Sequence, residues 1–174
     1  VEKHLKDHLV LKVVDGGREI AFAAFKVFTE TNLYVSGIMI RPEYQGWGLF
    51  AKLVAEARVQ TGIDGMNVCY LSLRTQSCPC FVAFTKLCSR WEPGGHHYEY
   101  GYDQILWAKG WTIAEFLGRK RQGNEMGYNL CKGVYGGPLY GKKPIYLGGH
   151  KQDYWDSLCN FERGDAIICI GALK

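Results

Sequence analysis

The chain lacks the features that mark a membrane protein or a secreted, disulfide-rich protein. No apolar run in its 174 residues approaches the roughly 18 residues of a membrane-spanning helix. The opening VEKHLKDHL is charged throughout and has no apolar core of a secretory signal. Its seven cysteines form no CxxC pair, and several lie inside apolar runs. We therefore expect reduced core thiols in a cytoplasmic protein.

The chain also lacks a strong charge of either sign and a paired set of metal ligands. Its 21 Lys+Arg and 17 Asp+Glu give a net charge of +4. This balance permits an anionic ligand but falls short of the basic surface of a dedicated nucleic-acid binder. Cys78, Cys80, His96 and His97 do not have the paired spacing of zinc ligands. We expect no metal, no nucleic-acid partner and no membrane association.

What is present is the composition of one globular domain over residues 1–174. Hydrophobic residues make up 47% of the chain and aromatic residues 14%, which is enough for a core without disulfide or metal support. No repeat or long linker divides the chain. Glycine is concentrated in residues 94–149, a stretch also rich in tyrosine, so this part is predicted to consist largely of loops.

The first half predicts three antiparallel strands followed by a helix. Strands are expected over residues 9–14, 20–28 and 33–40, with a glycine turn at residues 15–18 between the first two. Apolar residues at helical spacing predict a helix over residues 49–60, and Gly62 is a typical C-terminal cap.

The later elements are a strand over residues 66–73, a helix over 79–87 with Ser77 as its N-cap, a helix over 104–120 and a final strand over 166–173. The antiparallel start and the mixed order of elements predict an α/β fold of the mixed α+β kind, not a doubly wound sheet.

The segment between the third strand and the first helix carries the chemistry. A helix N-terminus offers unpaired N–H groups and the positive end of the helix dipole, which attract anions. Gly46 and Gly48 allow a ligand to approach the backbone closely. This pattern favours a phosphate or pyrophosphate site, and the alternative is a purely structural turn.

Two common phosphate-binding motifs do not fit this segment. Gly46 to Ala51 matches the loose dinucleotide pattern GxGxxG/A, but five residues separate the strand from Gly46, and that strand is antiparallel. Asp64 precedes the next strand, whereas the ribose-binding acid should end it. No GK[ST] follows the glycines, which excludes a Walker A loop.

The segment resembles motif A of the GNAT superfamily of N-acetyltransferases. The family pattern V-x-P-E-Y-Q-G-x-G corresponds here to I-R-P-E-Y-Q-G-W-G, which ends at Gly48. The flanking order of strands and helices agrees with that of the family. Residues 83–87 resemble, in degenerate form, the sequence of a later family helix. The resemblance covers residues 9–92. It implies a GNAT-like, mostly antiparallel central sheet flanked by helices, here with a C-terminal Gly/Tyr-rich extension.

The resemblance also implies acetyl-CoA as co-substrate and an amine as acceptor. The CoA pyrophosphate would lie on the backbone amides of the loop, and the pantetheine arm would pair with the end of the third strand. The N–H near Ile38 would stabilise the oxyanion, and the amine would attack the thioester directly. The residues implied at the cofactor are Ile38, Met39, Ile40, Gln45, Gly46, Trp47, Gly48, Leu49, Phe50 and Ala51.

The sequence departs from the family pattern at positions that matter for catalysis. Phe50 replaces the last small residue of the motif, and Phe84 replaces the tyrosine that often protonates the leaving thiolate. Ser36 stands where a carboxylate base is common. The general acid and base are therefore unassigned, with Ser36 and Tyr34 as weak candidates. His96 and His97 are interpreted as residues of a solvated loop.

The family usually has a strand and two helices before the first hairpin, but only eight residues precede Leu9 here. Either upstream sequence was removed, or residues 94–165 build the missing wall of the acceptor site. The tyrosines of that stretch would line an acceptor pocket or, as we favour, form an ordinary packing layer.

The sequence thus predicts an N-acetyltransferase that acts on an amine-bearing small molecule or protein. The alternatives are a catalytically weak or inactive acyl-CoA-binding module and an unrelated α+β domain. A homodimer is left open.

Overall fold

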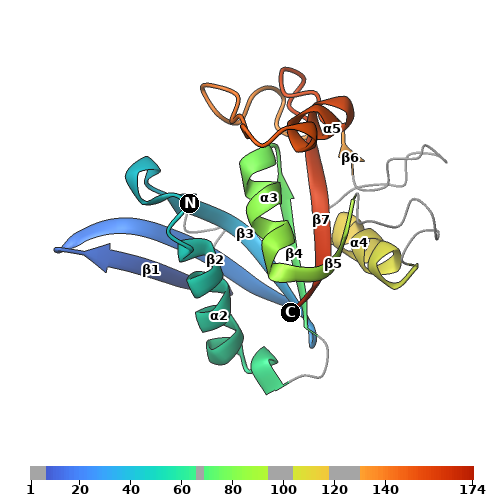
Figure 1. Ribbon diagram of the computed structural model, residues 1–174. Coiled ribbons are helices and arrows are strands. Elements are labelled where there is room, and N and C mark those ends of the chain that lie inside the picture. Colours follow the sequence, from blue (N-terminus) through green and yellow to red (C-terminus); the bar gives the residue numbers. More distant parts are fainter. Residues whose placement is uncertain (1–6, 66–68, 94–103, 118–129) are drawn as a thin grey trace. The chain divides into compact units, whose positions relative to one another are not determined.

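The computed structural model describes residues 7–65, 69–93, 104–117 and 130–174 (Figure 1). These residues form two compact units, an N-terminal unit of residues 1–71 and a C-terminal unit of residues 72–174. Each unit is described by itself. One domain over residues 1–174 stays a prediction.

The N-terminal unit begins with an antiparallel meander of three strands. Strand β1 (Leu9–Asp15) pairs with β2 (Arg18–Thr29), and β2 pairs with β3 (Asn32–Ile40). The turn between β1 and β2 places Gly16 and Gly17 at positive φ, the conformation that tight hairpin turns require. The three strands predicted from the sequence are confirmed to within two residues at each end.

Helix α2 (Leu49–Thr61) completes the N-terminal unit between two 3-10 turns, η1 (Pro42–Tyr44) and η2 (Ile63–Gly65). Its buried residues are Leu49, Phe50, Leu53, Val54 and Ala57, which include the apolar stripe seen in the sequence. Gly62 ends the helix in the left-handed conformation, and its N–H donates to the Val59 carbonyl at 3.1 Å. This cap was predicted.

The C-terminal unit is built around β7 (Ala166–Leu173), which is buried along most of its length. In this unit β7 lies between β4 and β5, and β6 also pairs with it. The other elements are β4 (Tyr70–Thr75), α3 (Cys78–Leu87), β5 (Cys88–Glu92), α4 (Gln104–Phe116), β6 (Leu130–Cys131) and α5 (His150–Leu158).

Most predicted elements of this unit are confirmed. Ser77 caps α3 by accepting the Cys80 N–H at 3.2 Å, and β7 has the predicted bounds. The strand predicted over 66–73 starts only at Tyr70, with part of the predicted range outside the described residues. Helix α4 ends at Phe116, short of residue 120. The mixed α+β class is confirmed.

Free thiols and aromatic rings fill the core of the C-terminal unit. Phe81 of α3 stacks on Trp155 of α5 with ring centroids 4.9 Å apart. All seven cysteines are described, none of them forms a disulfide, and all but Cys80 are buried. Burial raises the pKa of Cys78 to about 11 and that of Cys159 to about 12, so both thiols stay protonated and unreactive near neutral pH. The predicted core thiols are confirmed.

Gln76, directly after β4, joins three later segments of the same unit. Its buried side chain accepts the Leu139 N–H at 2.7 Å and donates to the Phe161 carbonyl at 3.4 Å. Its backbone carbonyl accepts the Trp155 indole N–H at 3.1 Å. The long loop between β6 and α5 is therefore held to the end of β4.

Replacing Gln76 with leucine is expected to lower the free energy of unfolding by about 2–3 kcal/mol. The change leaves the Leu139 N–H and the Phe161 carbonyl without their partners, and an orphaned buried polar group costs about 1–3 kcal/mol. Urea unfolding monitored by circular dichroism measures the loss. Gln60→Leu, at an exposed position of α2, is the control, and equal losses in the two variants would contradict the prediction.

Within the described ranges, no helix combines the length and apolar character that crossing a bilayer requires.

Candidate functional site

The loop that leads into α2 is held against the tip of the β1–β2 hairpin. The Arg41 N–H donates to the Ile20 carbonyl at 2.9 Å, and the Arg41 Nε donates to the Glu19 carbonyl at 2.7 Å. The Tyr44 hydroxyl donates to Asp15 Oδ2 at 2.9 Å. That hydrogen bond, above all, raises the pKa of Tyr44 and keeps its hydroxyl protonated. The loop conformation is thus set by the N-terminal unit itself.

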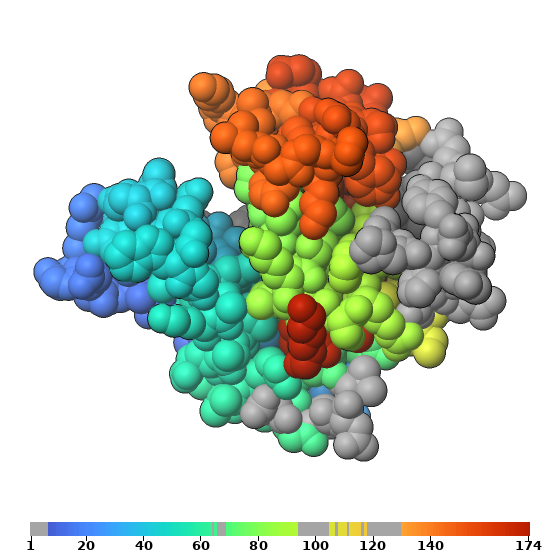
Figure 2. Space-filling model, in the orientation of Figure 1, coloured from blue at the N-terminus to red at the C-terminus, as the bar shows by residue number. Residues whose placement is uncertain are grey.

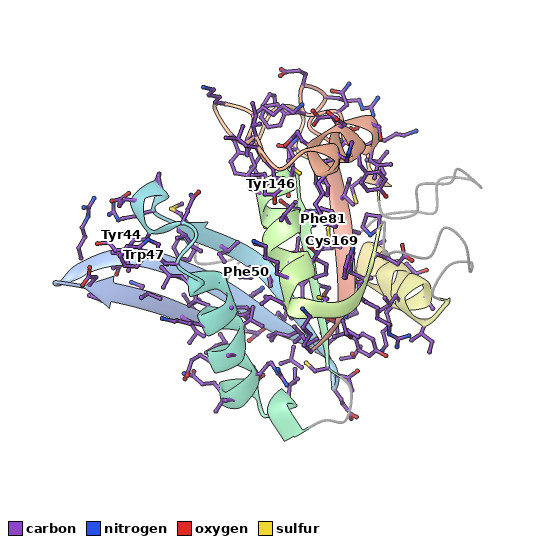
Figure 3. The ribbon with its side chains drawn as sticks, in the orientation of Figure 1. Tyr44, Trp47, Phe50, Phe81, Tyr146 and Cys169 are labelled. Atoms are coloured by element: carbon purple, nitrogen blue, oxygen red, sulfur yellow. The ribbon has the colours of Figure 1, made fainter. Side chains whose placement is uncertain are left out.

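Two left-handed glycines turn this loop into the helix. Gly46 has φ 85° and Gly48 has φ 74°, and a Cβ placed on either would meet no atom within 4 Å. Trp47, between them, is 66% exposed and packs edge-on against Tyr44 with ring centroids 5.4 Å apart (Figure 3). Phe50 points into the core and is only 7% exposed. The backbone at the two glycines is therefore open to a ligand, and Phe50 does not cover it.

The first turn of α2 has free hydrogen-bond donors. Gly48 provides no side-chain cap. Along the helix, the first backbone N–H with a hydrogen-bond acceptor is that of Lys52, which donates to the Gly48 carbonyl at 3.1 Å. Among the described residues, none accepts a hydrogen bond from the N–H groups of residues 48–51. The surface of this loop is cyan in Figure 2, and no other part of the N-terminal unit covers it on the face shown. These donors are available to an anion.

The charges around the helix start also favour an anion. The first turn of α2 contains no acidic residue, although acids are preferred there because they offset the helix dipole. Its fourth residue is Lys52, whose side chain is exposed. Glu43 of the loop is paired with Arg18 at 3.6 Å. The start of α2 therefore combines the positive end of the dipole with a lysine at the fourth position and no acidic residue in the first turn.

Strand β3 contains a β-bulge before the residues predicted to contact the cofactor. Gly37 pairs with Ala24, but Val35 pairs with Phe25, so Ser36 has no partner on β2. Ser36 is exposed, and a Cβ on Gly37 would meet open space. A bulge bends its strand and turns backbone groups out of the regular ladder. The bulge thus changes the course of β3 at the start of the 38–40 segment.

The ten residues predicted at the cofactor lie at the end of β3 and around the start of α2, all in the N-terminal unit. The Gln45 Nε2 links the two parts by donating to the Ile40 carbonyl at 3.1 Å. Met39 is 62% exposed, while Ile38 and Ile40 are half-buried. Their contact with a cofactor stays a prediction.

The weak catalytic candidates differ in their surroundings. Ser36 is exposed, whereas Tyr34 is buried and already has an interaction partner. Phe84 is fully buried in the C-terminal unit. His96 and His97 lie outside the described residues. Their roles, and that of Ser36, stay predictions.

Lys52 and the Arg41 contacts were not predicted from the sequence. A lysine in the first turn of a helix opposes the usual charge preference, and this anomaly was a readable signal. The Arg41 contacts depend on the hairpin register and could be found only in the structure.

Comparison with known proteins identifies the fold. No family model and no curated protein matches the chain. A solved IAA acetyltransferase from Bacillus cereus is similar with a TM-score of 0.51 and 14% identity, over 98% of this chain and 81% of that chain. A GNAT family acetyltransferase from Elizabethkingia anophelis, solved with acetyl-CoA bound, has a TM-score of 0.49 and 11% identity, over 99% and 80% of the two chains.

The similarity to the Bacillus cereus protein, at 14% identity, shows the fold. The chain shares the fold of that acetyltransferase, and the fold that the sequence resemblance implied is confirmed.

Proposed function

We propose that the chain is an N-acetyltransferase that uses acetyl-CoA and acetylates an amine. The observation that carries the proposal is the opening at the start of α2, where left-handed Gly46 and Gly48 leave the N–H groups of the first turn exposed. A pyrophosphate carries the charge and the acceptor oxygens that such an opening binds. The acetyltransferase fold supports acetyl-CoA as the molecule that brings it.

The proposed reaction is a direct transfer. The neutral amine nitrogen attacks the thioester carbon, the new C–N bond forms, and the carbonyl oxygen becomes an oxyanion. The N–H of Ile38, after the bulge in β3, is the proposed donor to that oxyanion. The C–S bond then breaks, the amine loses a proton to water, and the CoA thiolate takes one from water. Phe84 has no proton to give, which supports solvent in that role.

Amine acetylation should release CoA faster than the rate without acceptor. The purified chain is incubated with acetyl-CoA and a panel of small amines, peptides with free N-termini and lysine peptides. Released CoA is measured by chromatography, which separates it from acetyl-CoA. CoA release at the no-acceptor rate across the panel would count against the catalytic proposal.

A thermal-shift measurement separates the alternatives. A ligand that binds only the native state, at a free concentration of 100 times its Kd, raises the free energy of unfolding by about 2.7 kcal/mol. A shift with acetyl-CoA but without turnover would favour the acyl-CoA-binding module, for which the buried Phe84 and the exposed Ser36 are the supporting observations. No shift at millimolar acetyl-CoA would overturn the proposed function itself.

A further inference from the structure

Arg74 of β4 has a buried nitrogen that no protein group satisfies. The side chain is half-buried, and its Nε is shielded from solvent without a hydrogen-bond partner. Across the described residues, no group accepts a hydrogen bond from this Nε. A buried polar group without a partner costs free energy, and more so when it is charged. Such a group is therefore expected to have a function.

The partner of Arg74 that the structure does show is an aromatic ring. The guanidinium carbon lies 5.2 Å from the centroid of the Tyr135 ring, within the range of a cation–π contact. This contact uses the face of the guanidinium plane. The N–H donors point outward from the edge of the plane, so the ring contact does not satisfy their hydrogen-bonding capacity.

The loop that carries Tyr135 is fixed at several points of the C-terminal unit. The Tyr135 N–H donates to the Gly164 carbonyl at 3.1 Å, and the Gly133 N–H donates to Asp165 Oδ1 at 2.8 Å. The Leu139 N–H donates to Gln76, two residues after Arg74. Arg74 and Tyr135 are therefore held in place before any ligand binds, which reduces the entropy cost of binding.

Tyr140 adds a second hydroxyl to this cluster. Its side chain lies near Thr75, the residue after Arg74, and near Tyr135. Burial raises its pKa, so Tyr140 is neutral at physiological pH. The cluster of Arg74, Thr75, Tyr135 and Tyr140 thus combines one fixed positive charge with neutral hydroxyl groups.

We propose that Arg74, with Tyr135 and Tyr140, forms a carboxylate-binding site on the C-terminal unit. The ligand class that this site fits is a small molecule that bears a carboxylate. The fork of N–H donors on a guanidinium matches the two oxygens of a carboxylate. One guanidinium balances the single charge of a carboxylate, whereas a phosphate monoester carries nearly two charges at neutral pH.

The inference is tested by NMR on the complete 15N-labelled chain without acetyl-CoA. The Nε–H signal of Arg74 is assigned by its loss in Arg74→Lys. Sodium acetate and N-acetylglycine, a small molecule that bears a carboxylate, are expected to shift this signal. N-acetylglycinamide, the same molecule without the carboxylate, is expected to leave it in place. Equal shifts with the amide, or none with either carboxylate, would overturn the inference. A shift with inorganic phosphate alone would also overturn it.

Variant affinities provide a second measurement. Arg74→Met keeps most of the apolar stem and removes the charge, and it is expected to weaken N-acetylglycine binding by about 10- to 100-fold, as the loss of a charged hydrogen-bond pair does. Arg74→Lys keeps the charge without the forked donors. Its affinity for N-acetylglycine should fall between those of the wild type and Arg74→Met. Arg90→Met, which removes an exposed arginine from β5 of the same unit, should bind as the wild type does. Equal weakening in Arg90→Met would contradict the inference.

Acetyl-CoA binding distinguishes this inference from the proposed function. The thermal shift with acetyl-CoA should be the same in Arg74→Met and the wild type. If the thermal shift is present in the wild type but lost in Arg74→Met, Arg74 contacts the cofactor and the carboxylate inference is overturned. Its absence in the wild type would overturn the proposed function, while the acetate titration would still report on Arg74.

Discussion

Replacing Gly48 with alanine is expected to weaken acetyl-CoA binding by about 10- to 100-fold. Gly48 has φ 74°, and a Cβ there would project into the open space in front of the helix start. The methyl group therefore occupies the approach to the exposed N–H groups, and losing charged hydrogen bonds of this kind costs one to two orders of magnitude in affinity. Calorimetric titration with acetyl-CoA measures the change.

The same helix offers a matched control at its other end. Gly62 has φ 73°, and a Cβ there also meets no atom within 4 Å. Gly48→Ala and Gly62→Ala should therefore lose similar stability, about 1–2 kcal/mol for a left-handed alanine. Gly62→Ala should retain wild-type affinity for acetyl-CoA. If both variants bind equally well, the pyrophosphate does not lie on the first turn of α2.

The N-terminal unit was predictable because its signals are local. The apolar runs of the strands, the Gly16-Gly17 turn and the apolar stripe of α2 are signals that each extend over only a few residues. They predicted the bounds of the strands and of the helix closely. The glycine loop was predictable for the same reason, since Gly46 and Gly48 are read directly from the chain. The burial of Phe50 was predictable too, because Phe50 belongs to the apolar stripe of α2.

The C-terminal unit was less predictable because its order depends on distant contacts. Strand β5 directly follows α3 with no turn residue between them, and it pairs with β7, about 80 residues later. Helix α5 carries mostly polar residues, and only Trp155 of it is buried. The Arg74 cluster joins β4 to a glycine-rich loop 60 residues away, and no local pattern predicts that pairing.

The loop beside Arg74 depends on Asp165, and replacing this residue with asparagine is expected to destabilise the fold by about 2–4 kcal/mol. The Asp165 side chain is fully buried and accepts the N–H groups of Gly133 at 2.8 Å and Asn160 at 3.1 Å. It also accepts the Arg163 Nε at 2.7 Å. Asparagine has nearly the same shape but no charge. Its NH2 group replaces one acceptor oxygen and faces N–H groups that need an acceptor. Urea unfolding measures the loss, and Glu162→Gln, at an exposed position of the same turn, is the control.

The pH dependence of this loss follows from the pKa of Asp165. Burial by itself would raise that pKa, but the hydrogen bonds from Arg163, Gly133 and Asn160 outweigh burial and lower it. A carboxyl whose pKa is lower in the folded state stabilises the fold fully above its unfolded value, about 3.9. The stability gap between wild type and Asp165→Asn should therefore be constant above about pH 5 and shrink as the pH falls below 4. A gap that stays constant down to pH 2 would show that the charge of Asp165 does not stabilise the turn.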